Sequence, residues 1–271
     1  MAERAVDECY RDPIKTKLFA MSNGRPEIER RTDYLPRSPQ EEFIVPLLKV
    51  AIEAQIDRFL SPGQSKNAPR VLDAGCGGQP FRVRIEKTGA SYYSLDVCAQ
   101  SGVKVDFIAP IDEKHLPESV CQRGPYDLIL CSEVLEHVAE WDNVFANFHH
   151  LLAPSGHIIL TCPHFFPLHE EPYDFWRPST YAIRYFAQKH GFAIETERPL
   201  GTGWDVLGTL LAGQSFLPRT RSFTSRFVNR VCQVMRRWLF TLLRSRRLQD
   251  SVVDRGPLYL ANFFVLRKAD A

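Results

Sequence analysis

A glycine-rich turn at residues 75–78 is the feature of this chain best suited to binding chemistry. A short apolar run leads into Asp73, and Gly75, Gly77 and Gly78 follow it. Glycine adopts backbone conformations with positive φ and lets a ligand lie directly against main-chain amides. We expect a strand that ends in a cofactor-binding turn, with Asp73 anchoring the turn and Gly75 and Gly77 receiving a nucleoside.

The spacing of this turn differs from that of dinucleotide-binding proteins. Gln79-Pro80-Phe81 follows the glycines, so no third glycine stands where the GxGxxG fingerprint requires one. Nicotinamide cofactors are therefore disfavoured. A purely structural strand-to-helix turn in another α/β protein remains the alternative for this segment taken alone.

An acid at the end of the next predicted strand supports nucleoside binding. Asp96 closes the segment 91–96 at about the interval expected for the acid that binds ribose in a βαβ unit. A carboxylate accepts hydrogen bonds from two vicinal hydroxyls, and these bonds are stronger when it is ionised. We predict that Asp96 binds the ribose.

Several segments, in order along the chain, resemble the class I S-adenosylmethionine-dependent methyltransferases. Residues 71–78 resemble motif I of that family, two apolar residues and an acid before GxGxG, with Gln79 replacing the last glycine. The segment 112–117 resembles its D-x-x-x-L-P, and 126–138 resembles its fourth strand and the region that follows. The resemblance implies S-adenosyl-L-methionine as the cofactor.

The resemblance also implies roles for individual residues. Asp112 matches the acid of D-x-x-x-L-P, which accepts a hydrogen bond from the adenine amino group. The apolar side chains within 126–138 are assigned to core packing. Ser132, Glu133 and His137 are then the candidates in this region to face the cofactor.

Strand-like and helical segments alternate through the middle of the chain, which predicts a parallel sheet covered by helices on both faces. The resemblance implies the Rossmann-like class I methyltransferase fold, an α/β architecture with a mostly parallel seven-stranded sheet. Residues 153–156 are expected to form a turn before the fifth strand. The predicted strands are 70–73, 91–96, 103–108, 127–132, 157–162, 193–197 and 259–266.

Length and composition favour one domain with extensions, because 271 residues with 44% hydrophobic residues can bury one full α/β core. Seven cysteines without a CxxC pair indicate neither a zinc-binding pattern nor a disulfide framework. We therefore expect the protein to reside in a reducing cytoplasm. The charged start and the lack of an apolar run of roughly 20 residues predict neither export nor a membrane span. The expected parts are an N-terminal extension and cap helix (1–66), a methyltransferase core (67–200), a basic amphipathic helical insertion (201–255) and a final strand with the C-terminal tail (256–271).

Residues 163–178 concentrate two histidines, three acids, an arginine and five aromatic residues after the fifth strand. Loops at the carboxyl ends of strands line the ligand crevice in open α/β sheets. This block resembles a bacterial subgroup of methyltransferase type 11-like proteins associated with cell-surface polysaccharide biosynthesis. That resemblance implies a sugar or glycan acceptor.

Histidine can accept the proton of a sugar hydroxyl near neutral pH. We predict that His169 is the base, with His164 as the second candidate and Asp174 or Glu170 orienting the imidazole. The alternative is that these side chains only hold the loop together by bonding backbone amides. A metal site within this loop is disfavoured, because its prolines predict an extended course that spreads the side chains, and we expect metal independence.

The segment 219–247 carries nine arginines and no acid. On a helical wheel its apolar side chains, with Phe227, Met235 and Trp238 among them, fall on one arc and most arginines fall opposite. Such a helix suits an anionic membrane surface, which we expect it to contact between Arg226 and Arg247. The alternative is that the apolar arc packs on the sheet or on a second subunit.

Together these features predict a methyltransferase (EC 2.1.1.-) that O-methylates a sugar or glycan precursor in the cytoplasm, peripherally on the inner membrane face. A small lipid or quinone-like acceptor is the competing interpretation. A non-catalytic membrane-associated scaffold with the same fold is the alternative that is not an enzyme. A net charge of +2 without an RNA-binding motif does not predict nucleic-acid binding, and the sequence predicts no oligomeric state.

Overall fold

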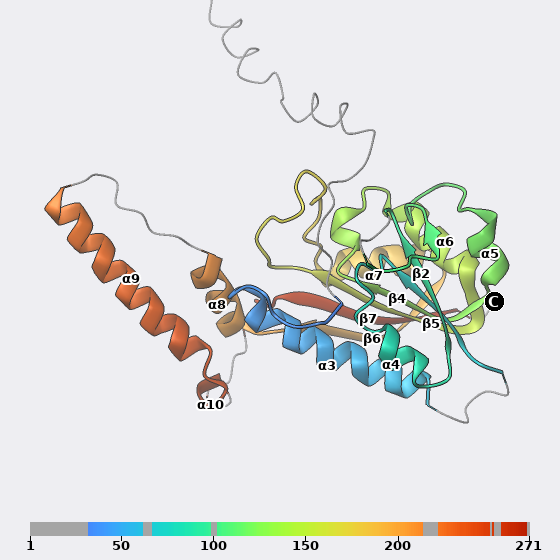
Figure 1. Cartoon of the computed structure of the whole chain (residues 1–271), viewed down its shortest axis with the longest axis horizontal. Helices are drawn as coiled ribbons and strands as arrows, with labels where there is room; N and C mark the ends of the chain where they lie inside the picture. Colours follow the sequence, from blue (N-terminus) through green and yellow to red (C-terminus); the bar gives the residue numbers. More distant parts are fainter. Residues whose placement is uncertain are drawn as a thin grey trace, which may run out of the picture.

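One seven-stranded sheet forms the centre of the molecule (Figure 1). The computed structural model describes residues 32–61, 67–98, 102–213, 222–249, 251 and 256–269, so residues 1–31 of the expected N-terminal extension lie outside the described part. The strand order is β3-β2-β1-β4-β5-β7-β6. The strands are β1 (Arg70–Ala74), β2 (Ser91–Asp96), β3 (Phe107–Ile108), β4 (Tyr126–Ser132), β5 (Leu152–Pro163), β6 (Phe192–Leu200) and β7 (Ala261–Lys268).

Neighbouring strands run parallel from β3 to β5, and β7 runs antiparallel to both β5 and β6. This confirms the predicted mostly parallel α/β architecture. The third strand is shorter than predicted because Asp106 bonds across to Ser94 instead of continuing the ladder. Its carboxylate accepts from the backbone amide and the hydroxyl of Ser94, at 3.0 and 2.8 Å.

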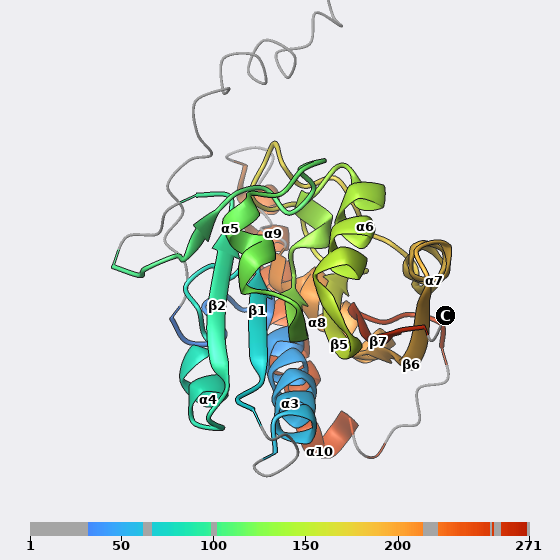
Figure 2. The ribbon, with the colours of Figure 1, turned by 90° about the vertical axis from the view of Figure 1, so that its right-hand side faces the viewer.

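Helices cover both faces of the sheet (Figure 2). Side chains of α5, α6 and α7 belong to one apolar core, and side chains of α3, α4 and α8 belong to the other. The helices are α3 (Glu41–Phe59), α4 (Arg82–Glu86), α5 (Glu118–Arg123), the 3-10 helix η1 (Leu135–His137), α6 (Trp141–Leu151), α7 (Thr180–Lys189), α8 (Gly203–Gly213), α9 (Phe223–Leu243) and α10 (Arg246–Gln249).

Side chains alternate between the two cores along β4. Leu128 and Leu130 pack on the α3 side, whereas Ile129 and Cys131 pack on the α6 side, and all four are buried. A parallel sheet covered on both faces produces such continuous apolar strands. The core role predicted for these leucines and isoleucine is confirmed.

The turn predicted at residues 153–156 is wrong in one respect: these residues belong to β5. Leu152 pairs with Tyr126 and His157 pairs with Leu128, so the four residues stand opposite Asp127 alone. The strand therefore begins before this irregular stretch and resumes after it.

The helix α9 extends away from the sheet at one end of the molecule and contacts α8 (Figure 1). Its last turn is anchored, because Leu243 is buried and the Phe240 ring meets the Phe43 ring of α3 at 5.7 Å. The Trp204 indole on α8 donates to the carbonyl of Leu243 at 3.1 Å. Among the described helices, none combines the length and apolarity needed to cross a membrane.

Candidate active site

The glycine turn after β1 has the expected positive φ at two of its three glycines, and Gly78 does not share it. Gly75 and Gly77 have φ values of 76° and 49°, and a Cβ added at Gly75 would lie 2.3 Å from Val134 Cγ2. The amides of Gly75 and Cys76 both donate to the carbonyl of Leu95 at the end of β2. Position 75 therefore requires glycine both for its dihedral angles and for its space.

Gln79 adopts a conformation typical of the glycine that it replaces in the family pattern. Its φ is 59°, in the left-handed region where side chains other than glycine are disfavoured. Its side-chain amide donates to the carbonyl of Lys104 at 2.6 Å, and Arg82 donates to its Oε1 at 2.9 Å. The turn thus alternates left-handed residues at 75, 77 and 79.

Two buried acids lie next to this turn. The Asp96 carboxylate accepts from the Gly77 amide at 2.9 Å, and the Asp73 carboxylate accepts from the Tyr92 hydroxyl at 2.6 Å. Burial raises the pKa of Asp73 to about 7, an effect that the Tyr92 hydrogen bond reduces and the charge of Asp96 increases. Asp96 therefore contacts the turn directly, whereas the hydrogen bond of Asp73 joins β1 to β2. The role of Asp73 as the anchor of the turn stays a prediction.

Two adjoining cavities lie at the carboxyl ends of β1, β2 and β4. Their volumes are about 290 and 50 Å³. Every residue that the sequence predicted to bind the cofactor lines at least one of them. Asp73, Gly77 and Ser132 line the larger cavity, Asp96 and Asp112 line the smaller, and Gly75, Glu133 and His137 line both.

Side chains of α6 hold the segment that carries Asp112. Asn143 donates to the carbonyl of Asp112 at 3.1 Å. Asn147 donates to the carbonyls of Ile111 and Glu113 at 2.7 and 2.8 Å. This brings Asp112 to the smaller cavity although it follows no long strand.

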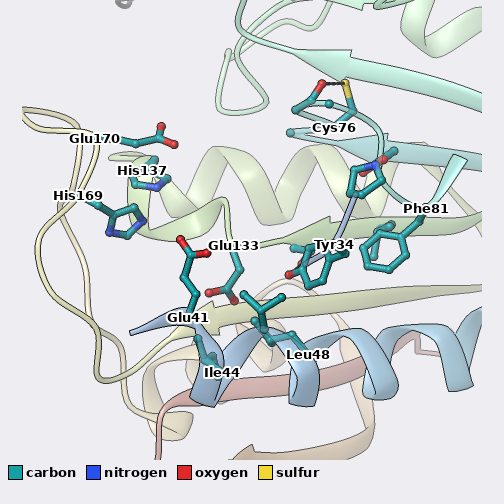
Figure 3. Close-up of a pocket in the computed structure, with 18 of the residues that line it drawn as sticks. Tyr34, Glu41, Ile44, Leu48, Cys76, Phe81, Glu133, His137, His169 and Glu170 are labelled. Carbon is teal, nitrogen blue, oxygen red and sulfur yellow. Dashed lines mark hydrogen bonds between the residues drawn. The ribbon is translucent and has the colours of Figure 1, made fainter. Parts of the chain in front are cut away.

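The loop at 163–178 borders the larger cavity with only one of its two histidines. His169 lines the cavity beside His137 (Figure 3). The His164 ring lies elsewhere, stacked on Tyr259 at 4.2 Å with Nδ1 2.9 Å from the carbonyl of Pro178. The structure therefore does not bring His164, the second predicted base, to the cavity, because this packing turns it toward β7.

Asp174 holds the loop and also faces the imidazole of His169. Its carboxylate accepts from the His169 amide at 2.8 Å and lies 3.3 Å from His169 Nδ1. Arg177 donates to both carboxylate oxygens, at 2.5 and 2.7 Å. Burial opposes ionisation, but the hydrogen bonds from Arg177 and the His169 amide lower the pKa of Asp174 overall.

The turn after β4 carries two acids with perturbed ionisation. Burial raises the pKa of Glu133 to about 7, although a hydrogen bond with Thr161 and the charge of Arg177 act against it. Burial and the charge of Glu133 raise the pKa of Glu136 well above its ordinary value. Burial also lowers the pKa of His137. Carboxyl groups that ionise near neutral pH are typical of catalytic sites.

Sequence reasoning did not place α3 at the site. Tyr34, Glu41, Ile44 and Leu48 line the larger cavity (Figure 3), and the Tyr34 hydroxyl lies 3.1 Å from Ser132 Oγ. The helical period of 41–60 predicted a cap over the core. No motif indicates which turn of such a helix lines a cavity. The helical periodicity predicted the helix but not its contact with the site.

Curated relatives match part of this chain. The ubiquinone biosynthesis O-methyltransferase of Vibrio campbellii is 32% identical over 103 residues, which cover 34% of this chain and 43% of that protein. The protein of the same name from Xylella fastidiosa is 31% identical over 114 residues, which cover 38% of this chain and 45% of that protein. This chain thus spans less than half the length of these relatives.

Two solved structures are similar to this chain at low sequence identity. An O-methyltransferase from a trans-AT PKS multienzyme of Brevibacillus brevis, in complex with S-adenosyl-L-homocysteine, is 15% identical with a TM-score of 0.49, covering 90% of this chain and 83% of that chain. A putative sarcosine dimethylglycine methyltransferase from Galdieria sulphuraria is also 15% identical with a TM-score of 0.49, covering 97% and 99%.

A family model covers more than half of the chain. Residues 47–198 match the model of the family described as a methyltransferase domain. The match begins within α3, includes the glycine turn, the acids at the strand ends and the loop at 163–178, and ends within β6. The chain therefore belongs to the methyltransferase domain family.

Proposed function

We propose that this protein is an S-adenosyl-L-methionine-dependent O-methyltransferase for a small-molecule hydroxyl. The observation that carries the proposal is that Gly75, Glu133 and His137 border both cavities. A cofactor held by the predicted residues would extend from the smaller cavity across this shared border into the larger one, where it would meet the acceptor. Holding the nucleophile in line with the methyl carbon supplies much of the catalysis in such a displacement.

The residues present fit this cofactor. S-adenosyl-L-methionine supplies an electrophilic methyl group on a sulfonium. Gly75 and Gly77 line the cavities without a side chain, so a ligand can lie against their main-chain atoms. Asp96 would accept from the ribose hydroxyls, and Asp112 would accept from the adenine amino group. Asp96 already receives the Gly77 amide, so its carboxylate would connect the glycine turn to the ribose.

His169 would receive the proton of the acceptor hydroxyl. While the acceptor oxygen bonds to the methyl carbon and the carbon–sulfur bond breaks, the hydroxyl proton would pass to His169 Nε2. Nδ1 of the same ring lies 3.2 Å from the Pro167 carbonyl and 3.3 Å from Asp174. Both of these oxygens accept hydrogen bonds, and they lie closer to Nδ1 than the donor Arg177 Nη2 does, at 3.4 Å. With the ring proton on Nδ1, Nε2 would be left to act as the base.

An acceptor with an apolar ring fits the larger cavity best, because much of the lining of this cavity is apolar or aromatic. The quinone-like interpretation is also favoured by the names of the two relatives, both ubiquinone biosynthesis O-methyltransferases. A sugar or glycan precursor is the second candidate, favoured by the carboxylates and imidazoles that also line this cavity. The apolar and aromatic lining residues are Tyr34, Ile44, Val45, Leu48, Phe81 and Phe166.

Calorimetry with S-adenosyl-L-methionine and S-adenosylhomocysteine tests the cofactor site first. We expect micromolar binding by the wild type, abolished in Asp96→Ala because the ribose loses its acceptor. Asp142→Ala is the matched control, since Asp142 is an exposed acid on α6 that pairs with Lys189. Equal affinity in Asp96→Ala would contradict the ribose role, and no binding by folded wild type would remove the central claim.

A screen of acceptors then separates the candidate functions. Methylation of phenolic or quinol-like compounds and not of sugar nucleotides would support the first acceptor class, and the reverse result would support the second. Cofactor binding without turnover on any acceptor would favour the scaffold alternative. His169→Ala is expected to lower turnover while leaving cofactor affinity nearly unchanged.

We also propose that α9 lies on an anionic membrane surface, which would bring a lipid-soluble acceptor near the enzyme. Its predicted apolar arc does not pack on the sheet: Phe227, Val234, Met235 and Trp238 are 60–69% exposed. The side that contacts the body is partly polar, and Arg236 donates to the carbonyl of Leu211 on α8 at 3.1 Å.

Charge complementarity favours a lipid surface as the occupant of this arc. Arg226, Arg230 and Arg237 are exposed and follow one edge of the arc on a helical wheel, and α9 contains no acid. Each basic residue near anionic lipid contributes about 1 kcal/mol. A second copy of the chain on the arc is the other possible outcome of the test.

Co-sedimentation with vesicles of anionic and of neutral lipid distinguishes these outcomes. We expect salt-sensitive binding to anionic vesicles, lost in Trp238→Glu. It should be retained in Val50→Glu, which places the same charge at an exposed apolar position of α3. Absence of binding at low and high salt, with a dimer in sedimentation velocity, would contradict the membrane role.

A further inference from the structure

Three potential metal ligands lie close together next to the larger cavity, which two of them, His137 and His169, line. Glu136, His137 and His169 each offer one ligand atom, and these atoms all lie within 4.8 Å of one another. Glu136 Oε1 is 3.7 Å from His137 Nε2 and 3.9 Å from His169 Nε2. The two imidazoles meet edge to face with their centroids 4.7 Å apart and lie side by side at one end of the cavity (Figure 3).

Both histidines direct the same nitrogen toward the carboxylate. His137 Nδ1 lies 2.9 Å from the carbonyl of Tyr173, and His169 Nδ1 lies next to the Pro167 carbonyl and Asp174. These oxygens only accept, and at His169 they lie closer to Nδ1 than the donor Arg177 Nη2 does, at 3.4 Å. A proton on Nδ1 of each ring would leave Nε2 to bind a metal ion. Histidines that bind metals are commonly oriented in this way, by a carbonyl or carboxylate on the other nitrogen.

Glu136 adds a third acceptor in a fully buried position. Its side chain is 0% exposed. The Cys162 thiol donates to Oε2 at 3.7 Å, whereas Oε1 has no hydrogen-bond partner among the described residues. A buried carboxylate oxygen without a donor is costly, and a cation between the three acceptors would satisfy it.

The surrounding charges also favour a cation. Glu133 and Glu170 line the same cavity. The neighbouring guanidinium of Arg177 is matched by its ion pair with Asp174. A divalent ion at this place would therefore lie among carboxyl groups and would stabilise their ionised forms.

We propose that Glu136, His137 and His169 bind one divalent transition-metal ion, with its remaining coordination positions open to the larger cavity. Two imidazoles and one carboxylate suit Zn²⁺ or Fe²⁺ better than Mg²⁺, which prefers oxygen ligands. Tetrahedral ligands of Zn²⁺ at about 2.0–2.1 Å lie roughly 3.4 Å apart. The two distances from Glu136, at 3.7 and 3.9 Å, would shorten by about half an ångström or less, and the two imidazole nitrogens, which lie within 4.8 Å of each other, would also move closer together. Metal independence was expected from the loop at 163–178, which supplies only His169. The other two ligands, Glu136 and His137, come from η1.

The consequence for catalysis rests on the proposed function. A metal ion at this place would bind the acceptor oxygen and lower the pKa of its hydroxyl. His169 would then be a ligand, and the hydroxyl proton would leave to solvent before methyl transfer. Metal binding itself can be measured without any acceptor.

The test is metal content and affinity of tag-free protein. After exposure to Zn²⁺ and dialysis, we expect one equivalent by mass spectrometry in the wild type and in His164→Ala, whose histidine belongs to the same loop but lies outside the cluster. Glu136→Gln, which conserves volume, and His169→Gln should bind Zn²⁺ at least about tenfold more weakly by calorimetry. Circular dichroism verifies the fold of each variant.

Two results would overturn the proposal. One is a wild type that retains no stoichiometric Zn²⁺, Fe²⁺, Co²⁺ or Mn²⁺. The other is unchanged Zn²⁺ affinity in a folded Glu136→Gln or His169→Gln variant, which would place the ion elsewhere. S-adenosyl-L-methionine affinity, measured in the same samples, reports separately on the proposed function, so failure of the metal site and failure of the methyltransferase proposal can be distinguished.

Discussion

Asp73 is a buried acid whose ionisation is linked to folding. Its pKa is raised from 3.8 to about 7 by burial, so the native state holds this proton more tightly than the unfolded state does. The free energy of unfolding should therefore fall as pH rises from about 4 to 7, by at most about 1.4 kcal/mol per pH unit from this group. Asp73→Asn is expected to flatten that slope in urea titrations.

The control for this prediction is the exposed Asp142, whose pKa is lowered by hydrogen bonds from Lys189 and His190. Asp142→Asn should leave the downward slope between pH 4 and 7 in place. Parallel pH profiles for the wild type and Asp73→Asn would show that burial does not hold the Asp73 proton. Tyr92, Asp96 and Cys76 are the titratable neighbours of Asp73 and are present in both proteins.

Gly75 and Gly89 allow a clash to be separated from backbone strain. Both have positive φ, at 76° and 87°, but an added Cβ meets Val134 at 2.3 Å at position 75 and nothing within 4 Å at position 89. Gly89→Ala should cost about 1–2 kcal/mol from strain alone, and Gly75→Ala should cost about 1–3 kcal/mol more from overpacking. Chemical denaturation measures both, and equal losses would mean that Val134 moves aside freely.

Among the elements, the loop at 163–178 depends on the guanidinium of Arg177. Besides Asp174, this group donates to the carbonyls of Phe166 and Pro167, at 3.0 and 3.1 Å. A lysine cannot reproduce this planar fork. Arg177→Lys should raise amide exchange across the loop and raise KM for the acceptor, with cofactor affinity unchanged.

Arg184→Lys is the matched control, because Arg184 makes a forked pair with Glu197 away from the cavity. It should affect neither the exchange of the loop nor KM. If amide exchange across the loop stays at the wild-type rate in Arg177→Lys, the loop is ordered by contacts other than those of Arg177.

The sequence predicted the elements far better than their details, for physical reasons. Strand positions follow from local apolar runs, and β2 matches its predicted bounds. The irregular start of β5 depends on pairing with β4, and the placement of Ile44 depends on packing across the chain. Both interactions join residues far apart in the sequence, so no spacing of residue types along the chain predicts them. The same holds for Glu136, which reads as one more residue of a short turn.

At the scale of the whole molecule, α9 is divided between an anchored end and an exposed arm. Trp238 is 69% exposed and Leu243 is 1% exposed. Trp238→Ser should therefore change the free energy of unfolding by less than about 0.5 kcal/mol, whereas Leu243→Ala should cost about 2–5 kcal/mol. Urea denaturation without lipid measures both. A large loss for Trp238→Ser would show that its indole is buried in solution, as in a dimer.

The wall formed by α3 has a consequence for how such a protein changes over time. The predicted cofactor contacts come from the strand ends, whereas Glu41, Ile44 and Leu48 reach the larger cavity from consecutive turns of one helix. Substitutions on that helix face can alter the shape and polarity offered to an acceptor without touching the glycine turn. Substrate preference is thus free to diverge between descendants of one ancestral enzyme while the methyl donor stays the same.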